Sequence, residues 1–296
     1  MSGVSLRMFA HFYYAREKIK LSLSKKQVYY VFAPAKTATS TYVNTLRLQE
    51  RNVLVYDGKS YMIDMQSLID RYRPGASVYT NLSKLKKNCK NHALNDLICG
   101  KGHAANKGVR IISGVRCPVS FFVSGVFQRL GRNPETKFLD NPVEIADYIN
   151  KRMSWDIVEK QITTPLEDLE HKSLLIPLKW HEKYFKKLLG FLPYDVEFDK
   201  DLGCGISERD GNTILILSQE SDRAIKSDCM RSITGNVNLS LIDKNVGVVK
   251  EYAQLYEMTK RYIKLDPCVA EYLKSTKYMN HFYGLNKSEE MLSKWM

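Results

Sequence analysis

The chain has 296 residues, of which 44% are hydrophobic, and it carries a formal net charge of +13. This length and this apolar content suffice for a globular domain with a sizeable core. No stretch approaches the roughly 20 apolar residues of a membrane span, and the six cysteines form no C-x-x-C pair, which disfavours a membrane-spanning protein, a zinc site and a disulfide framework. We therefore expect a cytoplasmic protein, and the excess of Lys and Arg favours an anionic partner.

Residues 1–27 mix aromatic and aliphatic side chains with basic ones. The apolar members include Phe9, Phe12, Ile19 and Leu21, and the basic members are Arg7, Arg16, Lys18, Lys20, Lys25 and Lys26. This basic amphipathic pattern is typical of a helix on an anionic membrane surface and also of a helix packed on its own domain. We treat residues 1–27 as a separate segment and 28–296 as one domain, because no Pro-, Gly- or Ser-rich linker and no repeat divides the rest.

Short apolar runs alternate with helical patterns along the rest of the chain. We predict strands over Val28–Phe32, Val53–Tyr56, Val78–Leu82, Val109–Val115 and Asn212–Ser218. We predict helices over Thr39–Leu48, Pro118–Arg129, Val143–Gln161 and a long C-terminal pair from Val248 onward. This alternation indicates an α/β protein with a parallel sheet flanked by helices and a helical C-terminal part.

The stretch PAKTATST follows the first predicted strand and leads into the first predicted helix. Ligands of such sheets bind at the carboxyl ends of the strands, and a helix N-terminus there attracts an anion through its unpaired N–H groups. Lys36 would add a movable cation. Hydroxyl donors are contributed by Thr37, Thr39, Ser40 and Thr41. The stretch therefore predicts a phosphate site, with simple helix capping as the alternative.

The usual nucleotide-binding loop has glycines where this chain has Tyr30 and Ala35. Without them a backbone that wraps a triphosphate is hard to build, which argues against an ATP or GTP site of the usual kind.

A second stretch, VRCPVSFFVSG, repeats the pattern of a strand end followed by a helix. Arg116 ends the predicted strand, Pro118 opens the helix, and Ser124 follows Arg116 by eight residues, about two helical turns. The arginine fork and the serine hydroxyl would suit one phosphate together. A surface arginine and an ordinary helix serine are the alternative.

These two stretches together resemble the sulfotransferases that use 3′-phosphoadenosine 5′-phosphosulfate (PAPS). The resemblance implies a P-loop-like sulfotransferase fold and binding of the 5′-phosphosulfate by Lys36, Thr37, Ala38 through its amide, Thr39, Ser40 and Thr41. It implies that Arg116 and Ser124 bind the 3′-phosphate.

A narrower resemblance, to the bacterial capsular polysaccharide synthesis proteins of the sulfotransferase-like group, covers Leu178–Asp222 and Ser275–Trp295. The chain departs from that group at His181-Glu182, at Tyr194–Val196 and at Ser218–Ser221.

In such a reaction negative charge accumulates on the leaving phosphate oxygen, and Lys36 would offset it without a metal. The acceptor hydroxyl also needs a base. The first candidate is His92, ahead of the Arg116 strand, and the second is His103; an ordinary loop histidine is the alternative for each. His281, in NHFYG, would either close the cofactor pocket or serve a core or surface role.

The resemblance implies transfer of the sulfuryl group to a carbohydrate hydroxyl of a cell-surface polysaccharide, oligosaccharide or glycolipid. Residues 84–110 carry seven basic side chains and a single acid, which would suit an anionic glycan, peripheral contact with the inner face of an anionic membrane, or solvent. A non-catalytic protein that binds PAPS, its bisphosphate product or another nucleotide is an alternative. A nucleic-acid-binding protein is another, although no such motif occurs and no nucleic acid is expected.

Overall fold

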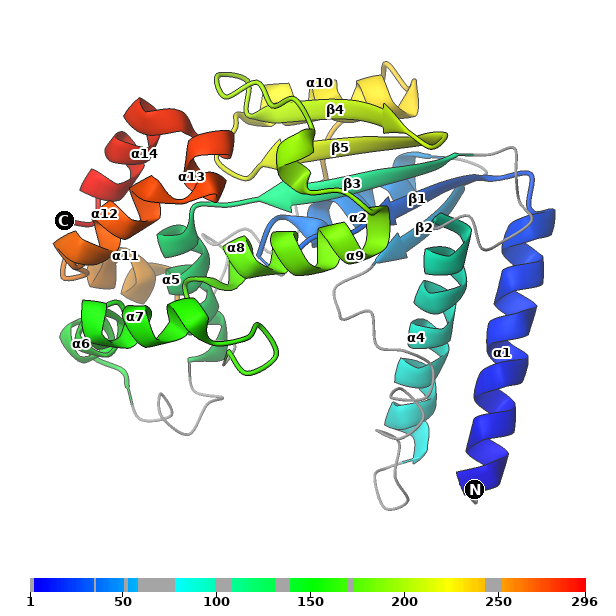
Figure 1. Cartoon of the computed structure of the whole chain (residues 1–296), viewed down its shortest axis with the longest axis horizontal. Coiled ribbons are helices and arrows are strands. Elements are labelled where there is room, and N and C mark those ends of the chain that lie inside the picture. The colour runs from blue at the N-terminus through cyan, green and yellow to red at the C-terminus, as the bar shows by residue number, and fades with distance from the viewer. Residues whose placement is uncertain are drawn as a thin grey trace.

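A computed structural model describes residues 3–34, 36–50, 53–57, 78–98, 108–130, 139–169, 173–242 and 252–296. Within these residues the chain forms a five-stranded sheet with the order β2-β1-β3-β5-β4 (Figure 1). The strands are β1 (Gln27–Val31), β2 (Val53–Asp57), β3 (Val109–Val115), β4 (Cys204–Arg209) and β5 (Asn212–Ser218). The four predicted strands β1, β2, β3 and β5 are confirmed, and they run parallel.

The carboxyl ends of β1, β3 and β5 meet at one edge of the sheet. Val31 pairs with Ile112, and Val115 pairs with Ser218. Because the strands are parallel and in this register, the segments that follow them emerge side by side. This edge therefore brings together residues about a hundred positions apart in the sequence.

The strand β4 is absent from the sequence-based prediction and pairs antiparallel with β5. The two strands are joined by Asp210 and Gly211, which have φ of 50° and 73°. An Asp-Gly pair with positive φ at both positions forms the tight turn that suits the twist of a hairpin. The sheet is therefore mixed, with an antiparallel edge.

Helices surround the sheet. Those in the first half of the chain are α1 (Gly3–Leu23), α2 (Thr39–Gln49), α4 (Val78–Ile98), α5 (Pro118–Arg129), α6 (Pro142–Arg152) and α7 (Trp155–Thr163). They are followed by α8 (Ile176–Trp180), the π-helical turn η1 (His181–Phe185), α9 (Lys186–Leu189) and the short turn η2 (Pro193–Asp195). The last are α10 (Arg223–Thr234), α11 (Ala253–Lys260), α12 (Pro267–Ser275), α13 (Lys277–Phe282) and α14 (Gly284–Ser293).

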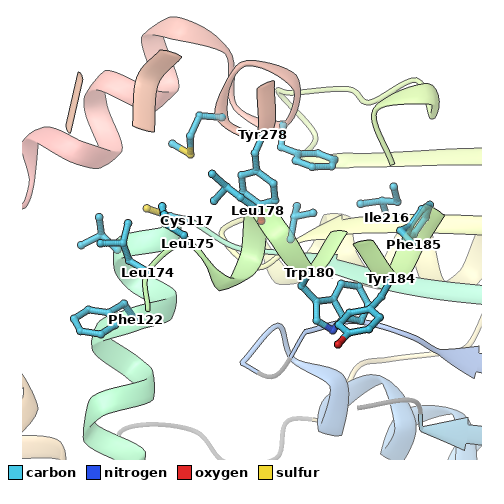
Figure 2. Packing of buried hydrophobic residues seen from close by; sticks show 14 of the residues in the cluster. Cys117, Phe122, Leu174, Leu175, Leu178, Trp180, Tyr184, Phe185, Ile216 and Tyr278 are labelled. Atoms are coloured by element: carbon cyan, nitrogen blue, oxygen red, sulfur yellow. The ribbon is translucent and has the colours of Figure 1, made fainter. Parts of the chain in front are cut away.

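Alternation along the strands gives each face of the sheet its own core. Tyr29 and Val31 pack with the buried residues of α2 and α10. Val28 and Tyr30 belong to the larger cluster on the other face, which includes residues of α4, α5, α8 and the C-terminal helices. Figure 2 shows part of this larger cluster, where Tyr278 of α13 lies over Leu178 of α8. An α/β protein with helices on both faces of a mostly parallel sheet is confirmed.

The predicted strand Val78–Leu82 is wrong, because these residues begin the 21-residue helix α4. Val78 and Tyr79 are residue types that favour a strand, but the residues that follow them have the spacing of a helix. The buried residues farther along, Leu85, Cys89 and Ala93, recur every four positions, which is helical spacing.

Two predicted helical stretches are divided in the structure. Residues 143–161 form α6 and α7, which are separated at Met153 and Ser154, and the backbone N–H of Trp155 donates to the carboxylate of Asp266 (2.9 Å). The predicted C-terminal pair is instead four short helices, α11 to α14. Pro267 is the first residue of α12, and the side chain of Thr276 caps the start of α13. Residues 243–251, where the pair was predicted to begin, lie outside the described residues.

Residues 3–23 of the N-terminal segment form one helix, α1, which lies beside α4 (Figure 1). The Cys89 thiol donates to the Ala10 carbonyl (3.5 Å), and Lys18 Nζ lies 3.8 Å from the Asp96 carboxylate, so the two helices run parallel. In the described part of the chain, no helix combines the length and the apolar character needed to cross a membrane.

Candidate functional site at the carboxyl edge of the sheet

The loop between β1 and α2 has an unusual backbone. Lys36 and Ala38 adopt positive φ, 72° and 58°, a region that residues other than glycine seldom occupy. The sequence lacks the glycines that usually build such a loop, yet the chain reaches the conformation with two side-chain-bearing residues. Left-handed residues in a loop are a common feature of backbone concavities that bind anions.

Thr37 fixes this loop onto the end of β3. Its side chain is buried and donates a hydrogen bond to the Pro34 carbonyl (2.7 Å). A Cβ at Gly114 would lie 2.6 Å from the Thr37 carbonyl oxygen and 2.7 Å from its Cβ, so this close approach requires glycine. The Thr37 hydroxyl therefore stabilises the loop itself.

The N-terminus of α2 has no side-chain cap. Its N-cap residue is Ala38, whose carbonyl accepts from the N–H groups of Thr41 (2.9 Å) and Tyr42 (3.2 Å). Thr39 and Thr41 are buried, while Ser40 and Lys36 are half-buried. The N-cap position itself is therefore held by a residue without a capping side chain.

Arg116 joins the two predicted phosphate-binding stretches. It follows β3, and its Nη1 donates to the Lys36 carbonyl (3.0 Å). Its Nε is buried and has no hydrogen-bond partner among the described residues. The guanidinium thus lies directly beside the Lys36 loop.

The backbone of Arg116 is held by the C-terminal part of the chain. The hydroxyl of Tyr278 accepts from the Arg116 N–H and donates to the Arg116 carbonyl, each at 3.0 Å. The carboxylate of Glu220, just after β5, accepts from the Cys117 N–H (3.0 Å) and from the Tyr283 hydroxyl (2.9 Å). Two elements distant in the sequence therefore position the arginine and the start of α5.

The amino-acid sequence alone assigns no role to Tyr278, Glu220 or Tyr283. Glu220 could have been predicted as a site residue, because it follows a buried strand by two residues and so lies at the carboxyl edge of the sheet. The two tyrosines lie in NHFYG and the residues just before it, and no local pattern pairs them with Arg116.

Ser124 lies farther along α5. It is half-buried and six residues after the first residue of the helix, about 9 Å along the helix axis.

The structure places His92 on α4 rather than in a loop. Its ring packs edge-on against Tyr14 of α1 (6.5 Å between centroids). Since α1 leads into the amino end of β1, these contacts tie His92 to the opposite end of that strand from Lys36. His103 lies outside the described residues.

His281 anchors α13. Its Nε2 hydrogen-bonds to the Val196 carbonyl (3.1 Å), and its ring packs against Tyr194 and Phe198. Burial lowers its pKa. These contacts support the core role rather than a direct role at the cofactor.

His181 is a fully buried histidine near the site. Its Nδ1 hydrogen-bonds to the Pro177 carbonyl (2.8 Å), and its ring lies 5.7 Å from that of Tyr278. Burial lowers its pKa to about 4, so it is neutral at pH 7.

A cavity of about 320 Å³ opens beside the same tyrosine. Its walls come from α7, α8, η1, α12 and α13, and its polar and aromatic residues are Lys179, Glu182, Tyr272, Ser275, Thr276, Lys277 and Tyr278. The hydroxyl of Tyr194 donates to Glu182 (3.3 Å). Trp180, two residues before Glu182, packs on Phe32 (4.7 Å), which leads toward the Lys36 loop.

Among the described residues, no three or more His, Cys, Asp and Glu side chains gather as a metal site. The fold and this edge define an α/β protein with a basic loop and an arginine at the carboxyl ends of neighbouring parallel strands. No family model, curated protein or solved structure matches the chain.

Proposed function

We propose that this protein is a PAPS-dependent sulfotransferase that acts on a carbohydrate hydroxyl. The observation that carries the proposal is the hydrogen bond from Arg116 Nη1 to the Lys36 carbonyl. It brings together two separate stretches, 80 residues apart, that resemble the two phosphate-binding motifs of that family.

The residues present fit a ligand with two anionic ends. The start of α2, whose N-cap residue is Ala38, and the left-handed Lys36 and Ala38 suit one phosphate, because a helix N-terminus and a lysine lie together there. Arg116 suits a second phosphate, and its buried Nε still lacks a partner among the described residues. Ser124, farther along α5, remains the proposed second ligand of that phosphate.

Bound PAPS would supply an activated sulfuryl group and leave as adenosine 3′,5′-bisphosphate. Lys36 would hold a positive charge beside the leaving oxygen, and such a preorganised charge stabilises the transition state more than the ground state. Thr37 would keep the loop in place through Pro34, and Tyr278 would keep Arg116 in place.

We propose the cavity beside Tyr278 as the acceptor site. Aromatic walls with a few charged side chains are typical of pockets that bind small polar ligands such as sugars. Glu182 is the carboxylate on this wall, so we propose it as the base in place of His92, which packs against α1.

The test is calorimetric titration of adenosine 3′,5′-bisphosphate into the wild type and Arg116→Ala, with 5′-AMP as the ligand without the 3′-phosphate. We expect the wild type to bind the bisphosphate at least tenfold more tightly than AMP and Arg116→Ala to lose that preference. The matched control is Arg47→Ala, in the last turn of α2 and exposed.

Equal binding of the two nucleotides by the wild type would contradict the proposal. Preference for the bisphosphate without sulfuryl transfer to any sugar acceptor would indicate a non-catalytic binding protein. Salt-dependent binding to any DNA or RNA, without nucleotide preference, would indicate a nucleic-acid-binding protein.

A further inference from the structure

The helix α1 carries apolar side chains on two opposite faces. One face packs on α4 and on the core, through the buried residues Ala10, Tyr13, Glu17 and Leu21. The other face carries Met8, Phe12, Ile19 and Leu23, which are 68%, 70%, 59% and 77% exposed. At 3.6 residues per turn these four side chains fall within an arc of about 60°, so they form one stripe along the helix.

This stripe has no cover among the described residues. Scattered exposed apolar residues are ordinary, but an aligned set on one helix is typical of a docking surface. Figure 1 shows α1 on the outside of α4, at the margin of the molecule. The stripe therefore lies on the side of α1 opposite the face that packs on α4.

The charges around the stripe are basic. Exposed basic side chains on α1 or directly after it are Arg16, Lys20, Lys25 and Lys26. The single acid of α1, Glu17, is 1% exposed and paired with Arg16 (3.1 Å). On α4 the side chains of Lys86 and Lys87 are also exposed, and the acid Asp96 is engaged by Lys18.

We infer that α1 lies on an anionic lipid surface, with Met8, Phe12, Ile19 and Leu23 inserted among the lipids and the basic side chains at the headgroups. An amphipathic helix with apolar anchors and flanking Lys and Arg binds in this way. A second copy of this chain fits less well, because an α1 to α1 contact would bring basic side chains against basic side chains. This inference does not depend on the proposed sulfotransferase activity.

The experiment is flotation of the full chain with vesicles of phosphatidylcholine, with and without phosphatidylglycerol. We expect binding only to the vesicles that contain phosphatidylglycerol, and weaker binding at high salt. The double variant Phe12→Ser, Ile19→Ser should lower the bound fraction at least tenfold. Both side chains are exposed, so the fold should persist, which circular dichroism and the melting temperature check.

The matched control is Val237→Ser with Leu285→Ser, which removes two exposed apolar side chains away from α1 (78% and 59% exposed). This control should bind vesicles as the wild type does.

Equal binding to both kinds of vesicle, or none, would overturn the inference. So would binding that Phe12→Ser, Ile19→Ser leaves unchanged, since charge alone would then suffice. A dimer in light scattering that the stripe variant dissociates, without vesicle binding, would also overturn it and assign the stripe to self-association.

Discussion

The hydroxyl of Tyr278 forms two hydrogen bonds with the backbone of Arg116, accepting from its N–H and donating to its carbonyl, both at 3.0 Å. The two residues are 162 positions apart. Through this contact the C-terminal helices fix the residue that ends β3. The position of the arginine therefore depends on the most distant part of the sequence.

Tyr278→Phe should loosen Arg116 without removing it. The part-buried N–H and carbonyl of Arg116 would each lose a partner, at a cost on the order of 2 kcal/mol in the free energy of unfolding. We expect adenosine 3′,5′-bisphosphate to bind about tenfold more weakly, as measured by calorimetry. Tyr272→Phe, which removes a hydroxyl from the same cavity on α12, should bind normally; a similar loss in both variants would rule out a specific effect of the Arg116 contact.

Gly114→Ala should displace the Lys36 loop. The added methyl group would lie 2.6 Å from the Thr37 carbonyl oxygen, so either the loop or β3 must shift. Overpacking of this kind costs about 1 to 3 kcal/mol of stability, and bisphosphate binding should fall with it. Urea unfolding measures the first effect and calorimetry the second.

The same change at Gly125 is the matched control for Gly114→Ala. Gly125 lies inside α5, and the nearest atom to its added Cβ is the end of the Arg129 side chain at 3.4 Å. Alanine is the better helix former, by about 1 kcal/mol. Equal destabilisation by the two substitutions would contradict the close approach of Thr37 to Gly114.

Lys36→Ala should slow sulfuryl transfer by on the order of a hundredfold, the usual cost of removing one preorganised charge. Lysine and alanine both carry a Cβ, so the steric cost of the positive φ at position 36 is the same in the variant. Turnover with labelled PAPS measures the effect. Lys160→Ala, on the exposed side of α7, should retain full activity; an equal loss there would remove the assigned role of Lys36.

Glu182→Gln tests the proposed base. Turnover should fall by on the order of a hundredfold, while bisphosphate binding stays unchanged, because Glu182 lines the cavity and not the Lys36 loop. His92→Gln, on α4, is the comparison variant and should retain turnover. If His92→Gln abolished turnover and Glu182→Gln did not, the base would be the histidine that the sequence first indicated.

His181 should make the stability depend on pH. Its pKa is about 4 in the folded protein and near 6.5 in the unfolded chain. Below pH 6.5 the unfolded state therefore binds the extra proton, so stability falls as the pH drops from 6.5 to about 4 and then levels off. Between these two pH values the free energy of unfolding falls by on the order of 3 kcal/mol.

His181→Leu should remove this part of the pH dependence. The measurement is the free energy of unfolding at pH 7 and at pH 4.5 in the variant and in the wild type. The difference between the two proteins removes the contribution of the carboxylates, which both share. An unchanged slope in His181→Leu would show that His181 is not buried in its neutral form.

Much of the local structure could be read from the chain itself. β-branched runs predicted β3 and β5 with their observed bounds, and Pro118 at the first turn predicted α5. These signals are local, because a buried parallel strand needs a continuous apolar run and a proline suits only the start of a helix. The candidate anion-binding residues were also chosen from the sequence, although their function stays a proposal.

Contacts between distant segments decided the rest. Residues 78–82 are helical because the turns after them pack on α1 and the core, and β4 exists because it pairs with β5. Neither contact leaves a pattern inside the short segment concerned, although Asp210-Gly211 was a readable hairpin signal. Likewise, only packing could show which side of α1 stays exposed.

The sequence by itself determined the alternation of strands and helices and the basic, hydroxyl-rich stretches that end two of the strands. Only the tertiary structure decided that Arg116 reaches the Lys36 carbonyl, that Tyr278 holds Arg116, and that His92 lies with α1. Local elements follow from the periodicity of neighbouring side chains, whereas these meetings depend on the register of the parallel strands and on the packing of the C-terminal helices.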